Sequence, residues 1–290
     1  MPLAATADLV ARAHAAGRGV AAFNVITLEH AEGIVVGAER VGSPVILQIS
    51  ENAVKFHGGR LQPIAAATVA MARTAGVDVS VHLDHVEDPD LLHQTASCGL
   101  SSVMFDASHL DYADNIAATK AAVDWAHSQG LFLEAELGKV GGKDGAHAPG
   151  IRTDPDEARE FVAATGVDAL AVAVGSSHAM TDRTSALDLE LVRRLAEVLP
   201  VPLVLHGSSG VPDDQLGAAV SAGMVKVNIG TILNVGFTGA VRRALAADEK
   251  VVDPRKYLRP ARDEMANIVA RLATVVRGDR GDRGDRGDVQ

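Results

Sequence analysis

The stretch VSVHLDHVED, residues 79–88, joins the pattern of a buried strand to a group of ionisable side chains. Its first half is apolar at alternate positions, which is typical of a strand inside a protein. Asp84 and His85 stand side by side at its end. Successive side chains of a regular strand point to opposite faces, so these two can share one site only if the strand has left its ladder there. The stretch therefore predicts a buried strand that ends in a polar site.

The same alternation of a short apolar run and a segment of helical period recurs along the chain. Eight runs predict strands: GVAAFNV (19–25), PVILQIS (44–50), VSVHLDH (79–85), SVMFDA (102–107), LFLEAELG (131–138), ALAVAVG (169–175), VPLVLHG (201–207) and MVKVNIG (224–230). Segments between them predict helices, among them 28–41, 61–76, 113–130 and 154–166. The last begins with Asp154 and Pro155, a helix start signal, and several close with Gly. This alternation is typical of βα units around a parallel sheet.

Eight βα units in 290 residues predict an α/β protein with a (β/α)8 TIM barrel. An open doubly wound sheet is the alternative, although its Gly-rich turn is missing after the first strand. The segment 253–276 predicts a C-terminal helix added to the barrel. We expect one domain over residues 1–276 and a disordered tail over 277–290, because RGDRGDRGDRGD has no apolar residue to bury.

Composition limits the classes of partner. The formal charge is −10, with 27 Lys and Arg against 37 Asp and Glu, and the body of the chain has no basic cluster. Nucleic acid and anionic membranes are therefore not expected partners. The N-terminus lacks the apolar segment of a signal peptide or membrane span, which predicts a cytoplasmic location. The single cysteine, Cys98, excludes an intrachain disulfide.

Every predicted strand ends in a polar residue that can act on a ligand. A barrel enzyme builds its active site at these carboxyl ends. The residues are Asn24, Ser50, Asp84 with His85, Asp106, Glu136, His178 just past its strand, His206 and Asn228. Strand ends are where polarity normally begins, and Asn24 or Ser50 alone needs no other explanation. Three histidines and three carboxylates at one end of the barrel are more ionisable groups than contact with solvent requires.

Three imidazoles from separate strands predict a divalent metal site with one position open to substrate. Zn²⁺ is the metal expected for His85, His178 and His206, with Co²⁺, Fe²⁺ and Mn²⁺ as alternatives. Asp106 and Glu136 either orient the imidazoles or form a second metal position. Asp84 is the expected general acid/base because it adjoins a metal ligand.

Two glycine-containing loops predict a phosphate site. Barrels commonly bind phosphate in the loops after strands seven and eight, where backbone amides point at the oxygens. The residues in those places are Gly207, Ser208, Ser209 and Gly210, and then Asn228, Ile229, Gly230 and Thr231. Their combination favours a phosphorylated substrate.

Seven stretches, taken in order, resemble the class II, metal-dependent ketose-bisphosphate aldolases over the chain up to about residue 276. They are AAFN, HLDH, VMFDASH, EAELG with VGG, GSSH, LVLHGSSG and VKVNIGT. The resemblance implies that Asp84 is the catalytic acid/base and that His85, His178 and His206 bind the catalytic metal. It implies a second metal position at Asp106 and Glu136, a monovalent cation near the phosphate site, and loops that hold dihydroxyacetone phosphate. It also implies a homodimer or homotetramer, with Arg255 as a substrate contact that can reach in from a neighbouring subunit.

The chain departs from the family pattern in three places. Val86 and Ala179 stand where the family has glycine after the Asp-His and after the sixth-strand histidine, so Ala179 can tighten the backbone approach to the phosphate. The loop after strand five is shorter, and Asp144 is the only acid left in its opening segment. By resemblance Asp144 takes the place of the glutamate that exchanges the carbon-bound proton; a solvated turn residue is the alternative.

The expected function is carbohydrate metabolism, with glycolysis as its setting. The reaction that the resemblance implies is reversible cleavage of fructose 1,6-bisphosphate to dihydroxyacetone phosphate and glyceraldehyde 3-phosphate. Tagatose 1,6-bisphosphate and 6-phospho-5-dehydro-2-deoxygluconate are alternative substrates. A Schiff-base aldolase is the enzymatic alternative and would need Lys226, the one candidate lysine inside the barrel. A non-catalytic binder of metal and sugar phosphate is the alternative from another class.

Overall fold

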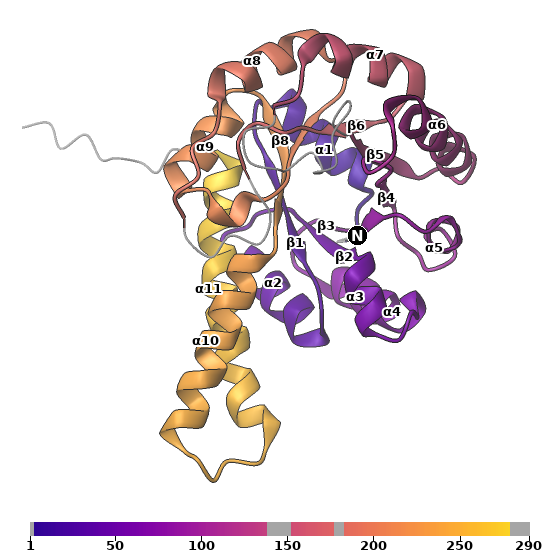
Figure 1. Cartoon of the computed structure of the whole chain (residues 1–290). Coiled ribbons are helices and arrows are strands. Elements are labelled where there is room, and N and C mark those ends of the chain that lie inside the picture. The colour runs from indigo at the N-terminus through magenta and orange to yellow at the C-terminus, as the bar shows by residue number, and fades with distance from the viewer. Residues whose placement is uncertain (1–2, 138–151, 177–182, 279–290) are drawn as a thin grey trace, which may run out of the picture.

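The computed structural model describes residues 3–137, 152–176 and 183–278. Eight parallel strands close into a barrel in the order β1-β2-β3-β4-β5-β6-β7-β8 (Figure 1). They are β1 Val20–Asn24, β2 Val45–Ser50, β3 Val79–Val86, β4 Ser102–Phe105, β5 Phe132–Glu136, β6 Ala169–Ala171, β7 Leu203–Leu205 and β8 Met224–Ile229. The predicted (β/α)8 barrel is confirmed, and because the barrel closes, the open doubly wound sheet was the wrong alternative.

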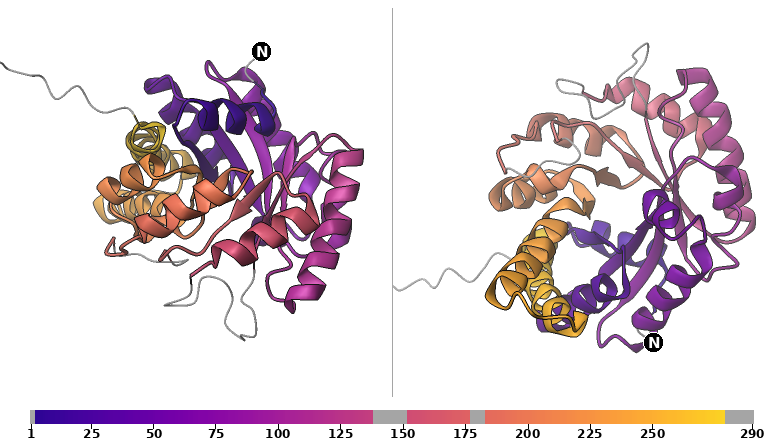
Figure 2. Two further views of the ribbon diagram at one scale, coloured as in Figure 1. Left: turned by 90° about the horizontal axis from the view of Figure 1, so that it is seen from above. Right: turned by 60° about the horizontal axis from the view of Figure 1, so that its bottom comes forward.

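Helices surround the barrel (Figure 2). They are α1 Thr6–Ala15, α2 Leu28–Arg40, α3 Glu51–Phe56, α4 Leu61–Thr74, α5 Pro89–Leu92, α6 Tyr112–Ser128, α7 Pro155–Thr165, α8 Leu189–Val198, α9 Asp213–Ser221, α10 Thr231–Ala247 and α11 Pro254–Arg277, with a 3-10 turn, η1, at Ser208–Gly210. Helix α7 begins as expected, since the side chain of Asp154 accepts the backbone N–H groups of Asp156 and Glu157.

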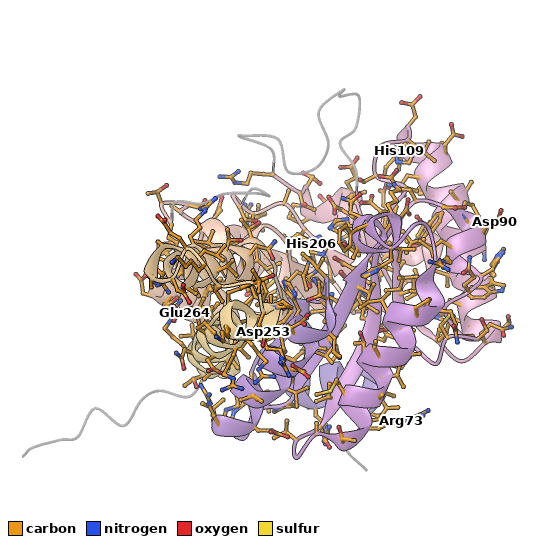
Figure 3. All side chains as sticks on the ribbon, turned by 90° about the horizontal axis from the view of Figure 1, so that it is seen from below. Arg73, Asp90, His109, His206, Asp253 and Glu264 are labelled. Carbon is orange, nitrogen blue, oxygen red and sulfur yellow. The ribbon has the colours of Figure 1, made fainter. Side chains whose placement is uncertain are left out.

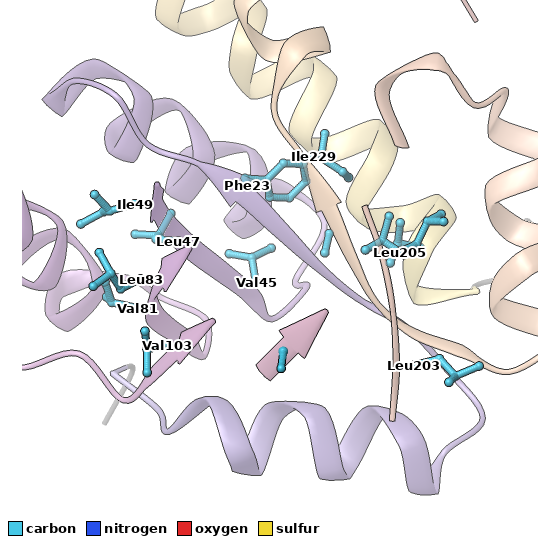
Figure 4. Packing of buried hydrophobic residues seen from close by; sticks show 14 of the residues in the cluster. Phe23, Val45, Leu47, Ile49, Val81, Leu83, Val103, Leu203, Leu205 and Ile229 are labelled. Atoms are coloured by element: carbon cyan, nitrogen blue, oxygen red, sulfur yellow. The ribbon is translucent and has the colours of Figure 1, made fainter. Parts of the chain in front are cut away.

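The strands divide their side chains between two environments. One set, which includes Phe23, Leu47, Leu83 and Leu205, packs against apolar helix residues and forms the main core (Figure 4). The alternate set points into the barrel, because strand side chains alternate between faces. At its carboxyl half this inner set is polar and buried: Gln48, His82, Asp84, Glu134, Glu136, Lys226 and Asn228. The barrel therefore carries its polar groups at the end where the active site is expected.

Helix α1 closes the opposite end. Leu9 and Val10 pack against Val20, Ala22 and Ile46. Beside them, the hydroxyl of Thr6 donates a hydrogen bond to Ser80 Oγ at 3.0 Å and accepts one from Ser102 Oγ at 2.7 Å. Because this end is filled by side chains, a small molecule can reach the interior polar groups only from the carboxyl ends of the strands.

The C-terminal helix predicted for 253–276 is confirmed as α11. It runs beside α10, and the pair extends beyond the barrel at the bottom of Figure 1. The disordered tail predicted from residue 277 starts too early, because Arg277 is the last residue of α11 and Gly278 caps the helix. Residues 279–290 lie outside the described residues. Among the described helices, none has the length and apolar character needed to cross a membrane.

The packing of α2 on α11 depends on Gly37. A Cβ atom added there would lie 2.5 Å from the backbone oxygen of Ala266 and 2.7 Å from Cβ of Val269. We therefore expect Gly37→Ala to lower the free energy of unfolding by about 1–3 kcal/mol through overpacking. Urea denaturation would measure the change. Gly217→Ala on α9 is the matched control, because nothing lies within 4 Å of the added atom; it should be neutral or stabilising.

Asp213, in the first turn of α9, connects three segments. Its Oδ1 lies 2.5 Å from Arg183 Nη1, and its Oδ2 contacts Arg271 of α11. Burial acts to raise the pKa of Asp213, but the guanidinium groups of Arg271 and Arg183 outweigh it and hold that pKa below its ordinary value. The carboxylate is consequently stabilised in the folded protein relative to the unfolded chain.

This contribution should depend on pH. Because the folded pKa is depressed, the stabilisation is present above the unfolded pKa of about 3.9 and is lost as the pH falls through the folded value. We expect Asp213→Asn to cost about 1 kcal/mol near neutral pH, given partial screening by solvent. The difference from wild type should shrink as the pH approaches about 3. Denaturation curves at both pH values test this, and Asp124→Asn, in an exposed pair with Lys120, is the control. An unchanged difference at low pH would contradict the prediction.

Candidate active site

The strand that carries Asp84 and His85 has an irregularity at these residues. Asp84 still pairs with Ser50 of β2. On the other side, the register with β4 shifts between Leu83 and Val86, and His85 has a φ of 49°. On the β4 side the strand therefore leaves its ladder at Asp84 and His85, as the sequence required, and rejoins it at Val86. The bulge turns His85 toward the side of Asp84. A positive φ is uncommon for a non-glycine residue and is found where a site over-determines the backbone.

A pocket of about 400 Å³ opens at the carboxyl ends of the strands. Eleven of the predicted site residues line it: Asn24, Ser50, Asp84, His85, Asp106, Gly207, Ser208, Ser209, Asn228, Gly230 and Thr231. They come from β1, β2, β3, the segments after β4 and β7, and the segment from the end of β8 to the start of α10. The structure therefore brings together residues that are up to 207 positions apart in the sequence.

Asp84 lies at the buried floor of this pocket. Its Oδ1 accepts the Asn228 amide at 3.3 Å, and its Oδ2 lies 3.4 Å from Gln48 Nε2. Burial raises the pKa of Asp84, and the positive charges of His85 and Lys226 only partly oppose that rise. A raised pKa brings a carboxyl group closer to the pH at which an enzyme works, which suits a general acid/base.

His85 is oriented by a carboxylate. Its Nδ1 lies 2.8 Å from Asp106 Oδ2, while Asp106 Oδ1 accepts both the backbone and hydroxyl hydrogens of Ser108. Burial opposes the charged imidazole, yet Asp84 and Asp106 together raise the pKa of His85 to about 10. Metal-binding histidines commonly hold such a carboxylate on one nitrogen and offer the other to the ion.

His206 completes a cluster that suits a divalent cation. It is fully buried near the middle of the molecule (Figure 3), and its ring centroid lies 4.7 Å from that of His85. Ligand atoms of Asp84, His85 and His206 lie within 4.8 Å of one another, and the same is true of His85, Asp106 and Glu136. Imidazole nitrogens combined with carboxylate oxygens are a donor set suited to Zn²⁺ and its neighbours.

The two predicted phosphate loops are joined to each other. Gly207 has a φ of 65°, and the following Ser208 hydroxyl donates to the carbonyl oxygen of Asn228 at 2.5 Å. Ser209 Oγ accepts the backbone N–H of Ile232 in the first turn of α10. The N-terminus of this 17-residue helix therefore borders the pocket. Backbone N–H groups at such an end favour an anion.

Some predicted site residues lie elsewhere or outside the described residues. The side chain of Ile229 belongs to the main core and does not line the pocket, because it faces away from Asn228 on β8 (Figure 4). The Arg255 side chain is 86% exposed and bound to Asp253 at the start of α11, away from this pocket. Asp144, His178 and Ala179 fall outside the described residues.

The structure adds buried residues that the sequence did not predict at the site, Gln48 and Glu134, and it places Lys226, considered from the sequence only as a Schiff-base lysine, beside them. All three are buried inside the barrel next to the site, and each stands two positions before a predicted site residue. Since residues two apart share a strand face, that spacing was an available signal. The rim also includes Glu51, Asn52, Lys55, Glu87 and Asn234, which lie on helices and a loop. Helix and loop positions of this kind carry no comparable periodic signal.

Lys226 is not placed as a Schiff-base lysine. Its Nζ is fully buried, 2.7 Å from Glu134 Oε2 and 2.8 Å from Asn228 Oδ1, and it does not line the pocket. A Schiff base needs a neutral amine that can reach a carbonyl carbon. The contacts of Lys226 with Glu134 and Asn228 favour a buried structural charge instead.

Comparison with known proteins agrees with this geometry. The family model described as fructose-bisphosphate aldolase class-II matches residues 4–280. The YdjI aldolase from Escherichia coli K12 is 33% identical, with a TM-score of 0.80 over 96% of this chain and 98% of that one. The fructose-bisphosphate aldolase of Campylobacter jejuni, 23% identical, shares the fold with a TM-score of 0.79 over 93% of both chains. The chain is therefore an aldolase of the class II fructose-bisphosphate aldolase family.

Proposed function

We propose that this aldolase reversibly cleaves fructose 1,6-bisphosphate to dihydroxyacetone phosphate and glyceraldehyde 3-phosphate. The observation that carries the proposal is the position of Asp84. Ligand atoms of Asp84, His85 and His206 lie within 4.8 Å of one another, and Asp84 lines the same pocket as residues of the two joined loops at Gly207–Ser209 and Asn228–Thr231. A ketose phosphate with its phosphate in those loops would present its carbonyl end to His85 and His206.

The donor set fits the divalent metal on which class II aldolases depend. We propose Zn²⁺, held by His85, His206 and His178, with Asp106 and Glu136 as a second position and a monovalent cation near the phosphate loops. A metal there would supply a Lewis acid that polarises the ketone carbonyl. Breaking the carbon–carbon bond beside a ketone requires such an electron sink.

The residues of the chain supply the proton transfers. Asp84 takes the proton from the hydroxyl on the aldehyde side of the bond, the hydroxyl becomes the aldehyde, and the bonding electrons pass to the ketone side. The resulting enediolate of the triose phosphate is protonated at carbon, and Asp144 is the proposed donor. In the reverse direction the same groups perform an aldol condensation.

Tagatose 1,6-bisphosphate and 6-phospho-5-dehydro-2-deoxygluconate are the alternative substrates. A coupled assay on all three, with metal removed and then restored, tests the proposal: the expected result is metal-dependent triose phosphate formation, fastest with fructose 1,6-bisphosphate. Faster turnover of another substrate would change the assignment within the family. Saturable binding of all three without product would instead show a non-catalytic sugar-phosphate binder.

The location, the pathway and the oligomeric state are proposed from the same family. We propose a cytoplasmic enzyme of glycolysis that forms a homodimer or homotetramer, in which Arg255 at the exposed start of α11 can reach the substrate of a neighbouring subunit. Residues 1–278, which include the end of α11 and its C-cap, would form one domain, and 279–290 would be a disordered tail. Sedimentation equilibrium would measure the oligomeric state, and a monomer would remove that role for Arg255.

A further inference from the structure

A buried ion pair lies beneath the candidate metal site. Lys226 Nζ is 2.7 Å from Glu134 Oε2, and neither side chain is exposed to solvent. Taking two charges out of water costs several kcal/mol, and apolar replacements of such pairs are often equally stable. Stability alone therefore gives no reason for the pair.

Both members of the pair contact the site above them. Glu134 Oε1 lies 3.0 Å from Nε2 of His206. Lys226 donates to Asn228 Oδ1 at 2.8 Å, and Asn228 in turn donates through Nδ2 to Asp84. Lys226 is thus linked through Glu134 to His206, the proposed metal ligand. It is also linked through Asn228 to Asp84, the proposed acid/base.

His206 has two competing neighbours at the same nitrogen. Nε2 lies 3.0 Å from the Glu134 carboxylate and also 3.0 Å from Asn228 Nδ2. It can donate a hydrogen to the carboxylate or accept one from the amide, and each choice fixes a different tautomer. With the hydrogen on Nε2, Nδ1 keeps its lone pair on the side of Glu136, whose Oε2 lies 3.7 Å away. With the hydrogen on Nδ1, that nitrogen is blocked to a metal.

We propose that Lys226 is a positioning residue, which acts through Glu134 and Asn228 to hold His206 in the tautomer that leaves Nδ1 open to the metal. The ammonium group keeps the carboxylate of Glu134 in place as the acceptor for Nε2–H. It also holds Asn228 Oδ1, so the amide hydrogens remain directed toward Asp84. The inference rests on the proposed assignment of His206 as a metal ligand.

The tautomer can be measured without any substitution. In ¹⁵N-labelled, metal-free wild-type protein, the imidazole ¹⁵N shifts of His206 should report Nε2–H. A His206 that carries its hydrogen on Nδ1 would overturn the inference. This measurement does not depend on catalytic activity, so it separates positioning from any effect on turnover.

Substitution then tests the role of the lysine. We expect Lys226→Met to raise the Zn²⁺ dissociation constant about 10–100-fold, the range for losing a group that orients a ligand, and to convert part of His206 to the Nδ1–H tautomer. Competition with a chromophoric chelator measures the affinity. Ser80→Ala, which removes a buried hydroxyl at the far end of the barrel, is the control for a general change of the interior.

Lys226→Met leaves the buried charge of Glu134 without a partner, and this can prevent folding. A second variant keeps the test decisive in that case. Lys226→Met/Glu134→Gln leaves no unpaired charge, yet the glutamine amide is no longer held toward Nε2, so Zn²⁺ affinity should still fall about tenfold. Folded variants that bind Zn²⁺ like wild type would overturn the inference. His206→Ala separates failure of the positioning role of Lys226 from failure of the proposed metal site. If His206→Ala does not weaken Zn²⁺ binding, the proposed metal site itself is wrong.

Discussion

Replacing Asp84 with asparagine is expected to lower kcat for ketose-bisphosphate cleavage by about 10²–10⁴-fold, the range that general acid–base groups contribute. Asparagine has nearly the same shape but cannot take a proton from the substrate hydroxyl. The KM and the bound metal content should change little, because His85 and His206 remain. Steady-state kinetics, with metal analysis of the same samples, would measure all three quantities.

The hydrogen-bond partners of Asp84 predict a second effect of the Asp84→Asn substitution, on stability. Its two oxygens face the amide groups of Asn228 and Gln48, which can only donate to it. An asparagine amide would place one N–H group against another donor, so some loss of stability should accompany the loss of activity. Thermal denaturation of the variant separates the two effects. Asp90→Asn is the control, since Asp90 is an exposed carboxylate on α5 at the edge of the molecule (Figure 3). A variant at Asp84 with more than a tenth of wild-type kcat would remove it from the acid/base role.

The fold was predictable because the strands are short, apolar and regularly spaced. Runs such as PVILQIS and VSVHLDH appear in the structure as β2 and β3, with bounds within one residue. Helix starts with a local signal were also found, as at Asp154 and Pro155. These features depend on interactions within a few residues, which sequence patterns record directly.

The candidate site was predictable in part, and the missing part has a physical explanation. The last polar residue of each strand was predictable as a site residue, whereas Glu134, two positions deeper, was not predicted, and Lys226 was predicted only as a Schiff-base candidate. Alternation places both side chains inside the barrel, but it does not show that they face each other, because that depends on how the ring closes, with β6 and β7 between β5 and β8. The bulge at His85 has no propensity signal, since a φ of 49° there is imposed by its surroundings. For Arg255 the family resemblance implied a substrate contact, while within one chain the side chain binds Asp253.

Removing the metal is expected to have the second large effect. Because Lewis-acid stabilisation of the transition state is worth several kcal/mol, chelation should lower the cleavage rate by roughly a thousandfold or more. Activity should return in proportion to added Zn²⁺, and Co²⁺, Fe²⁺ and Mn²⁺ should be compared with it. His206→Ala should show the same loss without chelator, and excess metal should restore little of it. His127→Ala is the matched control, because that imidazole lies on α6, paired with Asp168 and 45% exposed.

The chelation experiment also decides between the two aldolase chemistries. A Schiff-base enzyme would keep full activity without metal, and borohydride would trap the substrate on a lysine. The structure makes that outcome unexpected, because moving Lys226 to a substrate carbonyl would break its contact with Glu134 and leave a buried carboxylate without its cation. Full activity after chelation, together with a borohydride adduct on Lys226, would therefore contradict both the metal site and the positioning role of the lysine.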